Sequence, residues 1–196
     1  MSDKQTIEVY DARVEEYTRV FARTQPDAHL QGFIDELPPN SHVLDLGCGP
    51  GNSAAMIQAA GHSVDAVDAS HEMVRLAQKY VPARYGRFED IQETDAYDGI
   101  WANFSLLHAA REDMPSHLNA LATAIRAGGV LHLGMKLGSG SHRDRLGRFY
   151  TYYQAQELKT LLATAGFVTH FEDHGEAEGM AGPSEPFIIL RAKTRA

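Results

Sequence analysis

The chain has 196 residues, of which 43% are hydrophobic and 22% charged, and its net charge is −8. This length suits one domain, and the acidic balance makes nucleic acid an unexpected partner because a phosphate backbone would gain little attraction. The single cysteine, Cys48, excludes an intramolecular disulfide. The lack of a secretory signal or a membrane-length apolar run predicts a cytoplasmic protein without a membrane partner.

The first forty residues are expected to form helices. Apolar residues recur every three or four positions through residues 6–24, which predicts one amphipathic helix. A second helix is predicted from Pro26, a favourable first-turn residue, to Leu37, where two prolines follow. We expect residues 1–40 to form a helical cap on the rest of the domain.

From His42 onward, predicted strands and helices alternate. The strands are expected at 42–46, 63–67, 83–88, 97–104, 130–135, 167–171 and 187–190, and the helices at 53–60, 69–80, 114–127 and 153–165. Residues 137–149 and 173–186 are expected to be loops, the first of them mobile. Such alternation predicts βαβ units on a mostly parallel sheet, and the last two strands, joined without a helix, predict an antiparallel hairpin. We therefore expect one domain over residues 1–196. Its fold is predicted to be doubly wound α/β, with a seven-stranded mostly parallel sheet, an antiparallel C-terminal strand and helices on both faces.

The most informative stretch joins the first predicted strand to the next helix. It reads Val-Leu-Asp-Leu-Gly-Cys-Gly-Pro-Gly-Asn-Ser at positions 43–53, with glycines at 47, 49 and 51. Glycine allows positive φ and lets a ligand approach the main chain closely. A dinucleotide-binding loop would carry its third glycine where this chain has Asn52. This spacing, and the lack of a Tyr-x-x-x-Lys pattern, disfavour a nicotinamide dehydrogenase.

An acidic residue ends the second predicted strand. Asp68 lies about 20 residues after the glycine loop, where a carboxylate can accept both hydroxyls of a ribose. Asp68 could instead cap the following helix, but Ser70 is placed to do so. The loop and the acid together favour binding of a ribose.

The Gly-x-Gly-x-Gly pattern after an acidic strand resembles motif I of the class I S-adenosylmethionine (SAM) methyltransferases. Segments 64–73, 98–108 and 128–131 resemble the parts of small-molecule members that surround their second, fourth and fifth strands. The resemblance covers about residues 40–135. It implies an enzyme that moves a methyl group from SAM to a small-molecule acceptor by in-line displacement and releases S-adenosylhomocysteine (SAH).

The resemblance also implies contacts to the cofactor. In the family, residues like Asp68 hold the ribose and residues like Met73 flank the adenine. This chain has Gly86-Arg87 where the family often has Gly-Asp, just before the expected adenine contacts. The full set of implied cofactor residues is Asp45, Gly47, Gly49, Gly51, Asp68, Ala69, Met73, Phe88, Glu89 and Asn103.

Two candidate catalytic residues are Tyr10 and His108. His108 follows the fourth predicted strand, and an unperturbed imidazole suits a general base near neutral pH. It could equally hydrogen-bond to the backbone at a strand end. Tyr10 and Tyr17 lie on one face of the first predicted helix, which closes over the cofactor in related enzymes. Simple packing of that helix would explain both tyrosines as well.

Arg148 is the third candidate. It lies beside Arg143 and Arg145 at the end of the predicted loop 137–149. These side chains could clamp an anionic substrate, or they could only solvate the loop. Arg148 is the best candidate because aromatic residues follow it directly.

Several questions stay open at this level. The accepting atom could be oxygen, nitrogen, sulfur or part of an inorganic anion, and a homodimer is compatible with the sequence. The histidines show no metal-ligand spacing, so no metal site is expected. Residues 103–106 lack the Asn/Asp-Pro-Pro-aromatic motif of enzymes that methylate nucleic-acid amino groups. The alternative hypothesis is a non-catalytic regulatory protein that binds SAM or SAH.

Overall fold

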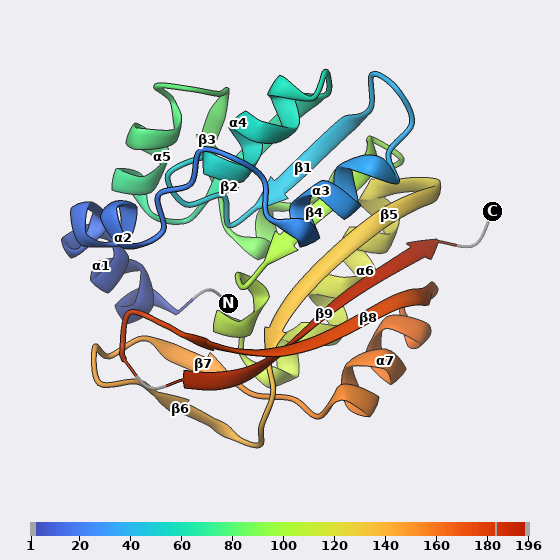
Figure 1. The fold of residues 1–196 in the computed structure, drawn as a ribbon. Helices are drawn as coiled ribbons and strands as arrows, with labels where there is room; N and C mark the ends of the chain where they lie inside the picture. The colour runs from blue at the N-terminus through green and yellow to red at the C-terminus, as the bar shows by residue number, and fades with distance from the viewer. Residues whose placement is uncertain (1–2, 183, 195–196) are drawn as a thin grey trace.

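The computed structural model describes residues 3–182 and 184–194, and its centre is a seven-stranded sheet (Figure 1). The strands of this sheet are β1 His42–Leu46, β2 Ser63–Asp68, β3 Ala83–Tyr85, β4 Tyr97–Asn103, β5 Ile125–Lys136, β8 Phe167–Glu178 and β9 Ser184–Thr194. Their order is β3-β2-β1-β4-β5-β9-β8. The first five strands pair in parallel, and β9 runs antiparallel between β5 and β8. The predicted doubly wound fold with an antiparallel C-terminal strand is confirmed.

Helices cover both faces of the sheet (Figure 1). They are α1 Lys4–Ala12, α2 Val14–Val20, α3 Ala28–Asp35, α4 Asn52–Ala59, α5 His71–Ala77, α6 Met114–Ala124 and α7 Ala155–Thr164. Alternate residues of β1 belong to two apolar clusters, Val43 to one with α3 and α4, and Leu44 to one with α6 and α7. Burial on both faces explains why β1 is nearly continuously apolar. None of the described helices is long and apolar enough to cross a membrane.

The N-terminal region differs from the prediction of one helix over residues 6–24. Arg13 leaves the helical conformation, with φ −122° and ψ 22°, and its N–H donates to the carbonyl of Tyr10 at 3.2 Å. The break lets α2 fold against α1, so that the rings of Tyr10 and Tyr17 meet edge to face at 5.6 Å. The apolar period continues through the break, which is why the sequence did not reveal it.

The helix predicted from Pro26 begins two residues later. Asp27 is its N-cap, because the carboxylate accepts hydrogen bonds from the N–H groups of His29 and Leu30 at 3.1 and 2.9 Å. The sequence placed proline in the first turn, whereas the carboxylate of the next residue sets the start.

Two other boundaries differ because strand pairing extends further than the apolar residues, and one strand is shorter than predicted. Helix α6 ends at Ala124, before the glycines expected to stop it, since Ile125 already pairs with Tyr97. Most of the expected loop 173–186 belongs to the long β8–β9 ladder, which reaches Glu178 paired with Ser184. Backbone hydrogen bonds hold a ladder whatever the side chains, so polar stretches can still form strands. Strand β3 ends at Tyr85, before the predicted end at 88.

The expected mobile loop 137–149 contains an ordered hairpin. Strands β6 Ser141–Arg143 and β7 Phe149–Thr151 pair antiparallel, and the hairpin lies on the same side of the sheet as α1 (Figure 1). It is held to α1 by two ion-paired hydrogen bonds from Arg143 to Asp3, both 2.8 Å long, and by a 2.8 Å bond from the Phe149 N–H to Thr6 Oγ1. Contacts so distant in sequence leave no local pattern.

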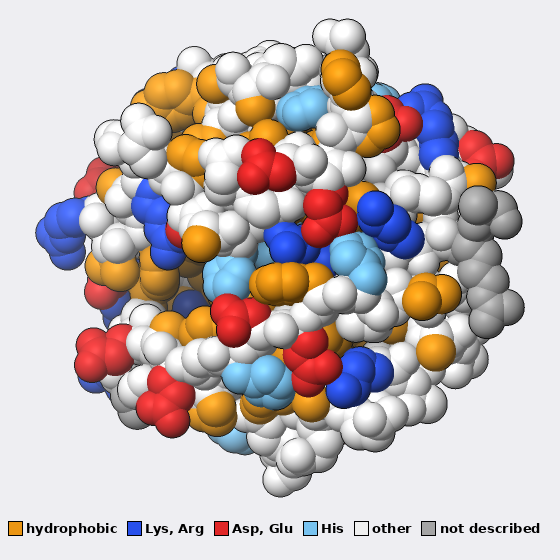
Figure 2. Space-filling view, turned by 45° about the vertical axis from the view of Figure 1, so that its right-hand side comes forward, with side chains coloured by type: hydrophobic (Ala, Val, Ile, Leu, Met, Phe, Trp, Pro, Cys, Tyr) orange, Lys and Arg blue, Asp and Glu red, His pale blue; other side chains and the backbone are white. Residues whose placement is uncertain are grey.

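The face that Figure 2 presents carries acidic, basic and histidine side chains side by side, with no basic patch. Ion pairs between oppositely charged side chains also join the end of α3 to the C-terminal strands. Glu36, for example, lies 2.7 Å from His170 and 2.9 Å from Arg191.

We predict that Asp27→Ala lowers the free energy of unfolding by about 1 kcal/mol, because two N–H groups of α3 lose their acceptor. Asp35→Ala is the matched control, since its exposed side chain accepts from no described residue other than Gln31. It should cost less than about 0.5 kcal/mol. Urea denaturation midpoints measure both, and equal losses would contradict the capping role of Asp27.

Candidate functional site

The site is built around the loop between β1 and α4. The N–H groups of Gly47 and Cys48 both donate to the carbonyl of Val67 in β2, at 2.8 and 3.0 Å. Gly47 has φ of 76°, and a Cβ there would lie 2.3 Å from the Cβ of Ser105. Only glycine fits this position, because both the conformation and the contact exclude a side chain.

Two adjoining cavities flank this loop. The larger has a volume of about 360 Å³ and the smaller about 90 Å³. Both are lined by Tyr10, Tyr17, Gly47, Asn103 and Phe104, so these residues form the boundary between them.

The smaller cavity gathers most of the predicted nucleoside contacts. Besides the shared residues, its lining includes Gly49, Asp68, Ala69, Met73 and Phe88. The larger cavity includes Asp45. Gly51 and Glu89 line neither cavity, although both were predicted to contact the cofactor. A Cβ on Gly51 would lie 3.0 Å from that of Ala77, so this glycine lets α4 and α5 pack closely.

Asp68 joins the loop to the helix after β2. One carboxylate oxygen accepts from the N–H of Gly49 and the other from the N–H of Ser70, both at 2.8 Å. Burial raises the pKa of Asp68, and the two backbone hydrogen bonds oppose that shift. Ser70 itself caps α5, as predicted, by accepting from the Met73 N–H. The predicted capping role of Ser70 is therefore confirmed, and ribose binding by Asp68 stays a prediction.

Asp45, which lines the larger cavity, is 2% exposed. Within the described part of the chain, its Oδ2 has no hydrogen-bond partner. Burial, and then the nearby carboxylate of Asp68, raise the pKa of Asp45 to about 8. An unpartnered buried carboxyl group in a cavity wall fits a cationic ligand group, which would restore its charge.

Asn103 is oriented by a histidine that the sequence analysis did not identify. His132 is fully buried, stacks on Trp101 at 3.7 Å between ring centroids, and lies 3.1 Å from Asn103 Oδ1 through its Nε2. Its pKa is lowered well below the usual value by burial, so the ring is neutral. With the proton on Nε2, the histidine donates to Asn103 and leaves the amide nitrogen free to face the cavities. Gly134 makes room, because a Cβ there would lie 2.4 Å from Asn103 Oδ1.

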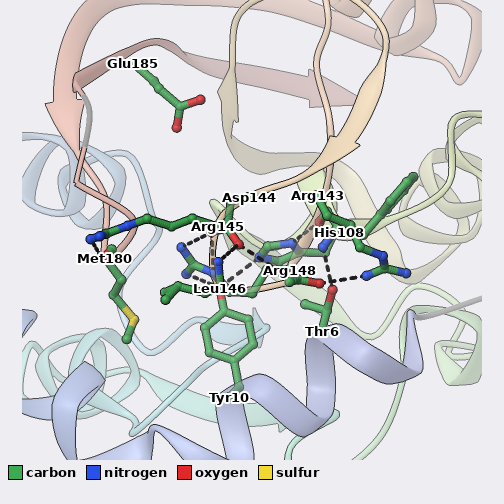
Figure 3. Close-up of polar contacts among 12 residues, drawn as sticks. Thr6, Tyr10, His108, Arg143, Asp144, Arg145, Leu146, Arg148, Met180 and Glu185 are labelled. Atoms are coloured by element: carbon green, nitrogen blue, oxygen red, sulfur yellow. Dashed lines mark hydrogen bonds and ion pairs between the residues drawn. The ribbon is translucent and has the colours of Figure 1, made fainter.

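The structure brings the three candidate catalytic residues together (Figure 3). Tyr10 from α1 has its hydroxyl 2.9 Å from His108 Nε2, and Arg148 Nη1 donates to that hydroxyl at 3.2 Å. His108 Nδ1 lies 2.6 Å from the carbonyl of Phe149, which can only accept, so Nδ1 carries the proton. Tyr10 therefore donates to the bare Nε2.

His108 does not keep the near-neutral pKa expected from the sequence. Burial lowers the pKa of His108 to about 4, and the hydrogen bond to the carbonyl of Phe149 opposes this only partly. The ring is thus neutral at neutral pH but weakly basic. Burial also raises the pKa of Tyr10, which keeps its phenol protonated.

The other two arginines of the hairpin point elsewhere. Arg143 binds Asp3 and the carbonyl of Gly147, and Arg145 donates to the carbonyl of Met180 at 3.4 Å (Figure 3). The larger cavity instead gains Lys136, a further cation that the sequence analysis passed over. Its position at the end of β5 was a usable signal, since the carboxyl ends of parallel strands meet at the same edge of the sheet.

Comparison with known proteins gives a consistent result. The family described as "Methyltransferase domain" matches residues 43–129. A protein named "Uncharacterized methyltransferase" from Staphylococcus carnosus is 27% identical over 173 residues, covering 84% of this chain and 80% of its own length. The trans-aconitate 2-methyltransferase of Paracidovorax citrulli is 35% identical over 120 residues, covering 58% of this chain and 45% of its own length. This chain thus spans less than half of that relative.

A solved structure shares the fold. The 1,6-didemethyltoxoflavin-N1-methyltransferase of Burkholderia thailandensis, with SAH bound, aligns with a TM-score of 0.75 at 20% identity, covering 98% of this chain and 88% of its own. Residues 43–129 thus match a methyltransferase domain, and the chain has the fold of the class I SAM-dependent methyltransferases. Its cofactor is SAM, and its product is SAH.

The residues present fit this cofactor. The unpartnered carboxyl group of Asp45 suits the ammonium group of the methionine part of SAM, and the glycine loop leaves the main chain open to close approach. The cavity with Asp68, Met73 and Phe88 suits a nucleoside. Among the described residues, no group of three or more His, Cys, Asp or Glu side chains is arranged to hold a metal ion.

We predict that the affinity of this methyltransferase for SAH rises as the pH increases towards about 8, since the ionised form of Asp45 binds the ammonium group. The raised pKa has the opposite effect on the cofactor-free fold. The free energy of unfolding should fall as the pH rises from about 4 towards 8, because ionising the buried group favours the unfolded chain. Asp45→Asn should remove this loss and abolish SAH binding, with calorimetry and thermal unfolding as the measurements. A binding profile that is flat from pH 6 to 9 would contradict the role of Asp45.

We predict that His132→Leu weakens SAH binding by about 1 kcal/mol, because Asn103 loses the donor that orients it. His132→Gln keeps an N–H donor near the position of Nε2 and should stay within about twofold of the wild type. Calorimetry measures both, with His170→Gln as the control on an exposed histidine. Equal losses in the Gln and Leu variants would mean that His132 contributes packing only.

Proposed function

We propose that this methyltransferase methylates a small-molecule acceptor held in the larger cavity, while the nucleoside of SAM lies in the smaller one. The observation that carries this proposal is the common boundary of the two cavities at Tyr10, Asn103 and Phe104. An acceptor on one side of this boundary can face a methyl donor on the other. The name of the trans-aconitate 2-methyltransferase relative, whose substrate is a small molecule, is in keeping with this acceptor class.

When bound, SAM supplies an electrophilic methyl group on a positively charged sulfur. An in-line displacement needs alignment above all, so the chain contributes chiefly by holding both partners. We assign the cofactor to Asp45, Asp68 and the loop glycines Gly47 and Gly49. Ala69, Met73, Phe88 and Asn103 complete the proposed contacts around it.

Tyr10, His108 and Arg148 act in this proposal as a unit at the boundary between the cavities, where Arg148 lines the larger, His108 the smaller and Tyr10 both. Tyr10 can pass a proton to the bare Nε2 of His108 while Arg148 holds its hydroxyl oxygen. With a pKa of about 4, His108 is a weak proton acceptor. The unit therefore suits an acceptor whose reacting atom already carries a free lone pair at neutral pH.

Residues 1–40 form the cap over the cofactor in this proposal. Its support is that Tyr10 and Tyr17 line both cavities, and that Asn52 at the start of α4 donates to the carbonyl of Phe21 at 3.2 Å. A cap of this kind excludes water from the reacting groups. We further propose a cytoplasmic protein without a nucleic-acid partner, consistent with its charge of −8. A homodimer is compatible with the proposal but is not needed for it.

The proposal is tested first by calorimetry with SAM, SAH and NAD. We expect binding of SAM and SAH but not of NAD, and Asp68→Ala should weaken SAH binding by roughly 1–3 kcal/mol. Asp65→Ala is the matched control, because it removes a half-exposed carboxylate from the same strand. Tight NAD binding without SAH binding would refute the cofactor assignment.

Turnover separates catalysis from the alternative of a non-catalytic SAM-binding protein, which no comparison supports. Labelled SAM is incubated with small acids, phenols, amines and thiols, and transfer of label to one class is expected. Binding of SAH without transfer to any class would favour the alternative.

A further inference from the structure

We propose that the acceptor of this methyltransferase carries a carboxylate group, which binds between Arg148 and Lys136 in the larger cavity. This inference rests on the proposed function and adds the chemical class of the substrate. It starts from the hydrogen-bonding capacity of the cavity wall around Tyr150.

Arg148 is 3% exposed and lines the cavity from the segment just before β7. Its Nε and Nη2 donate to Asp144 Oδ2 at 2.9 and 2.7 Å, and Nη1 donates to Tyr10. Burial opposes its charge, but Tyr10, Tyr150 and Asp144 hold the pKa of Arg148 above its usual value. A guanidinium has five N–H donors, so two remain beyond these three bonds within the described part of the chain.

Lys136 reaches the same place from the end of β5. Its ammonium pairs with Glu185 of β9 and lies 4.0 Å from the centroid of the Tyr150 ring. The Arg148 guanidinium carbon lies 5.3 Å from that centroid. Two cations from different segments, the buried Arg148 and the nearly buried Lys136, therefore lie near Tyr150.

The anionic partners of these cations are already engaged. Asp144 accepts four hydrogen bonds, two from Arg148 side-chain nitrogens and two from the backbone N–H groups of Leu146 and Arg148. Glu185 accepts from Tyr152 at 2.7 Å and from Lys136. Figure 3 shows Asp144 beside Arg148, whereas Glu185 lies apart from it.

The wall around Tyr150 thus carries more donor hydrogens than free acceptor atoms. A ligand with oxygen acceptors satisfies them, and a planar carboxylate does so with charge as well. An ammonium group would meet two cations and few free lone pairs. The other carboxylates that line the cavity are Asp27, Asp45 and Glu178. Asp27 caps α3, Asp45 is assigned to the cofactor, and Glu178 is exposed on the β8–β9 hairpin.

The weak basicity of His108 agrees with this class. A carboxylate is ionised at neutral pH and brings its charge to the site without losing a proton to the protein. The geometry of the two cations carries the inference, and the neutral histidine is compatible with it.

The test is calorimetry on the full chain loaded with SAH. The probes are succinate, fumarate, citrate and trans-aconitate, each compared with its neutral amide. We expect at least one acid to bind and its amide to bind at least tenfold more weakly. Lys136→Met should weaken that acid about tenfold, as expected when one of two charged hydrogen-bond donors is lost. Affinity for SAH should change by less than about twofold in this variant.

Lys159→Met is the matched control, because this lysine lies on α7 outside both cavities and pairs with Glu172. Arg148→Lys provides a second cavity variant that keeps the charge but loses the forked geometry, and thermal unfolding checks its fold. Acids that bind no better than their amides, or unchanged acid affinity in Lys136→Met, would overturn the inference. Failure of the wild type to bind SAH would instead refute the proposed function.

Discussion

The site depends on two carboxyl groups at the ends of adjacent strands, the buried Asp45 and the half-buried Asp68. Removing charge from water is costly, so the protein compensates each group differently. Asp68 receives two backbone N–H groups, whereas Asp45 Oδ2 has no partner within the described residues. The first arrangement fixes the glycine loop, and the second leaves a place for a cation. Together they make a site that is complete only with its cofactor bound.

The proposed acceptor side is assembled from parts of the chain that are far apart in sequence. Helix α1 brings Tyr10, the turn after β4 brings His108, and the hairpin brings Arg148. Ion-paired hydrogen bonds between Arg143 and Asp3 hold the hairpin to the start of α1. Cap and hairpin thus stabilise each other, and the position of the phenol depends on both.

Much of the fold and of the cofactor side could be predicted from the sequence. Strands buried on both faces leave apolar runs, and the glycine loop and Asp68 leave a fixed spacing that backbone sterics require. Gly51 and Glu89 line neither cavity. For Gly51 the sequence prediction differs because spacing alone does not distinguish a glycine that permits helix packing from one that faces a ligand. The helix break at Arg13 was missed because the apolar period continues through it. The β6–β7 hairpin was missed because contacts with Asp3 and Thr6, distant in sequence, hold it.

By itself, the sequence determined the doubly wound sheet, the glycine loop proposed to hold SAM and the residues that end the strands. These features are local, because each follows from the conformational preference or burial of a short segment. Only the tertiary structure decided that Tyr10, His108 and Arg148 meet, that His132 orients Asn103, and that Lys136 joins Arg148 beside Tyr150. Such contacts depend on where packing places distant segments. The pKa of His108 depends on the same packing, because burial removes the water that would stabilise its charge.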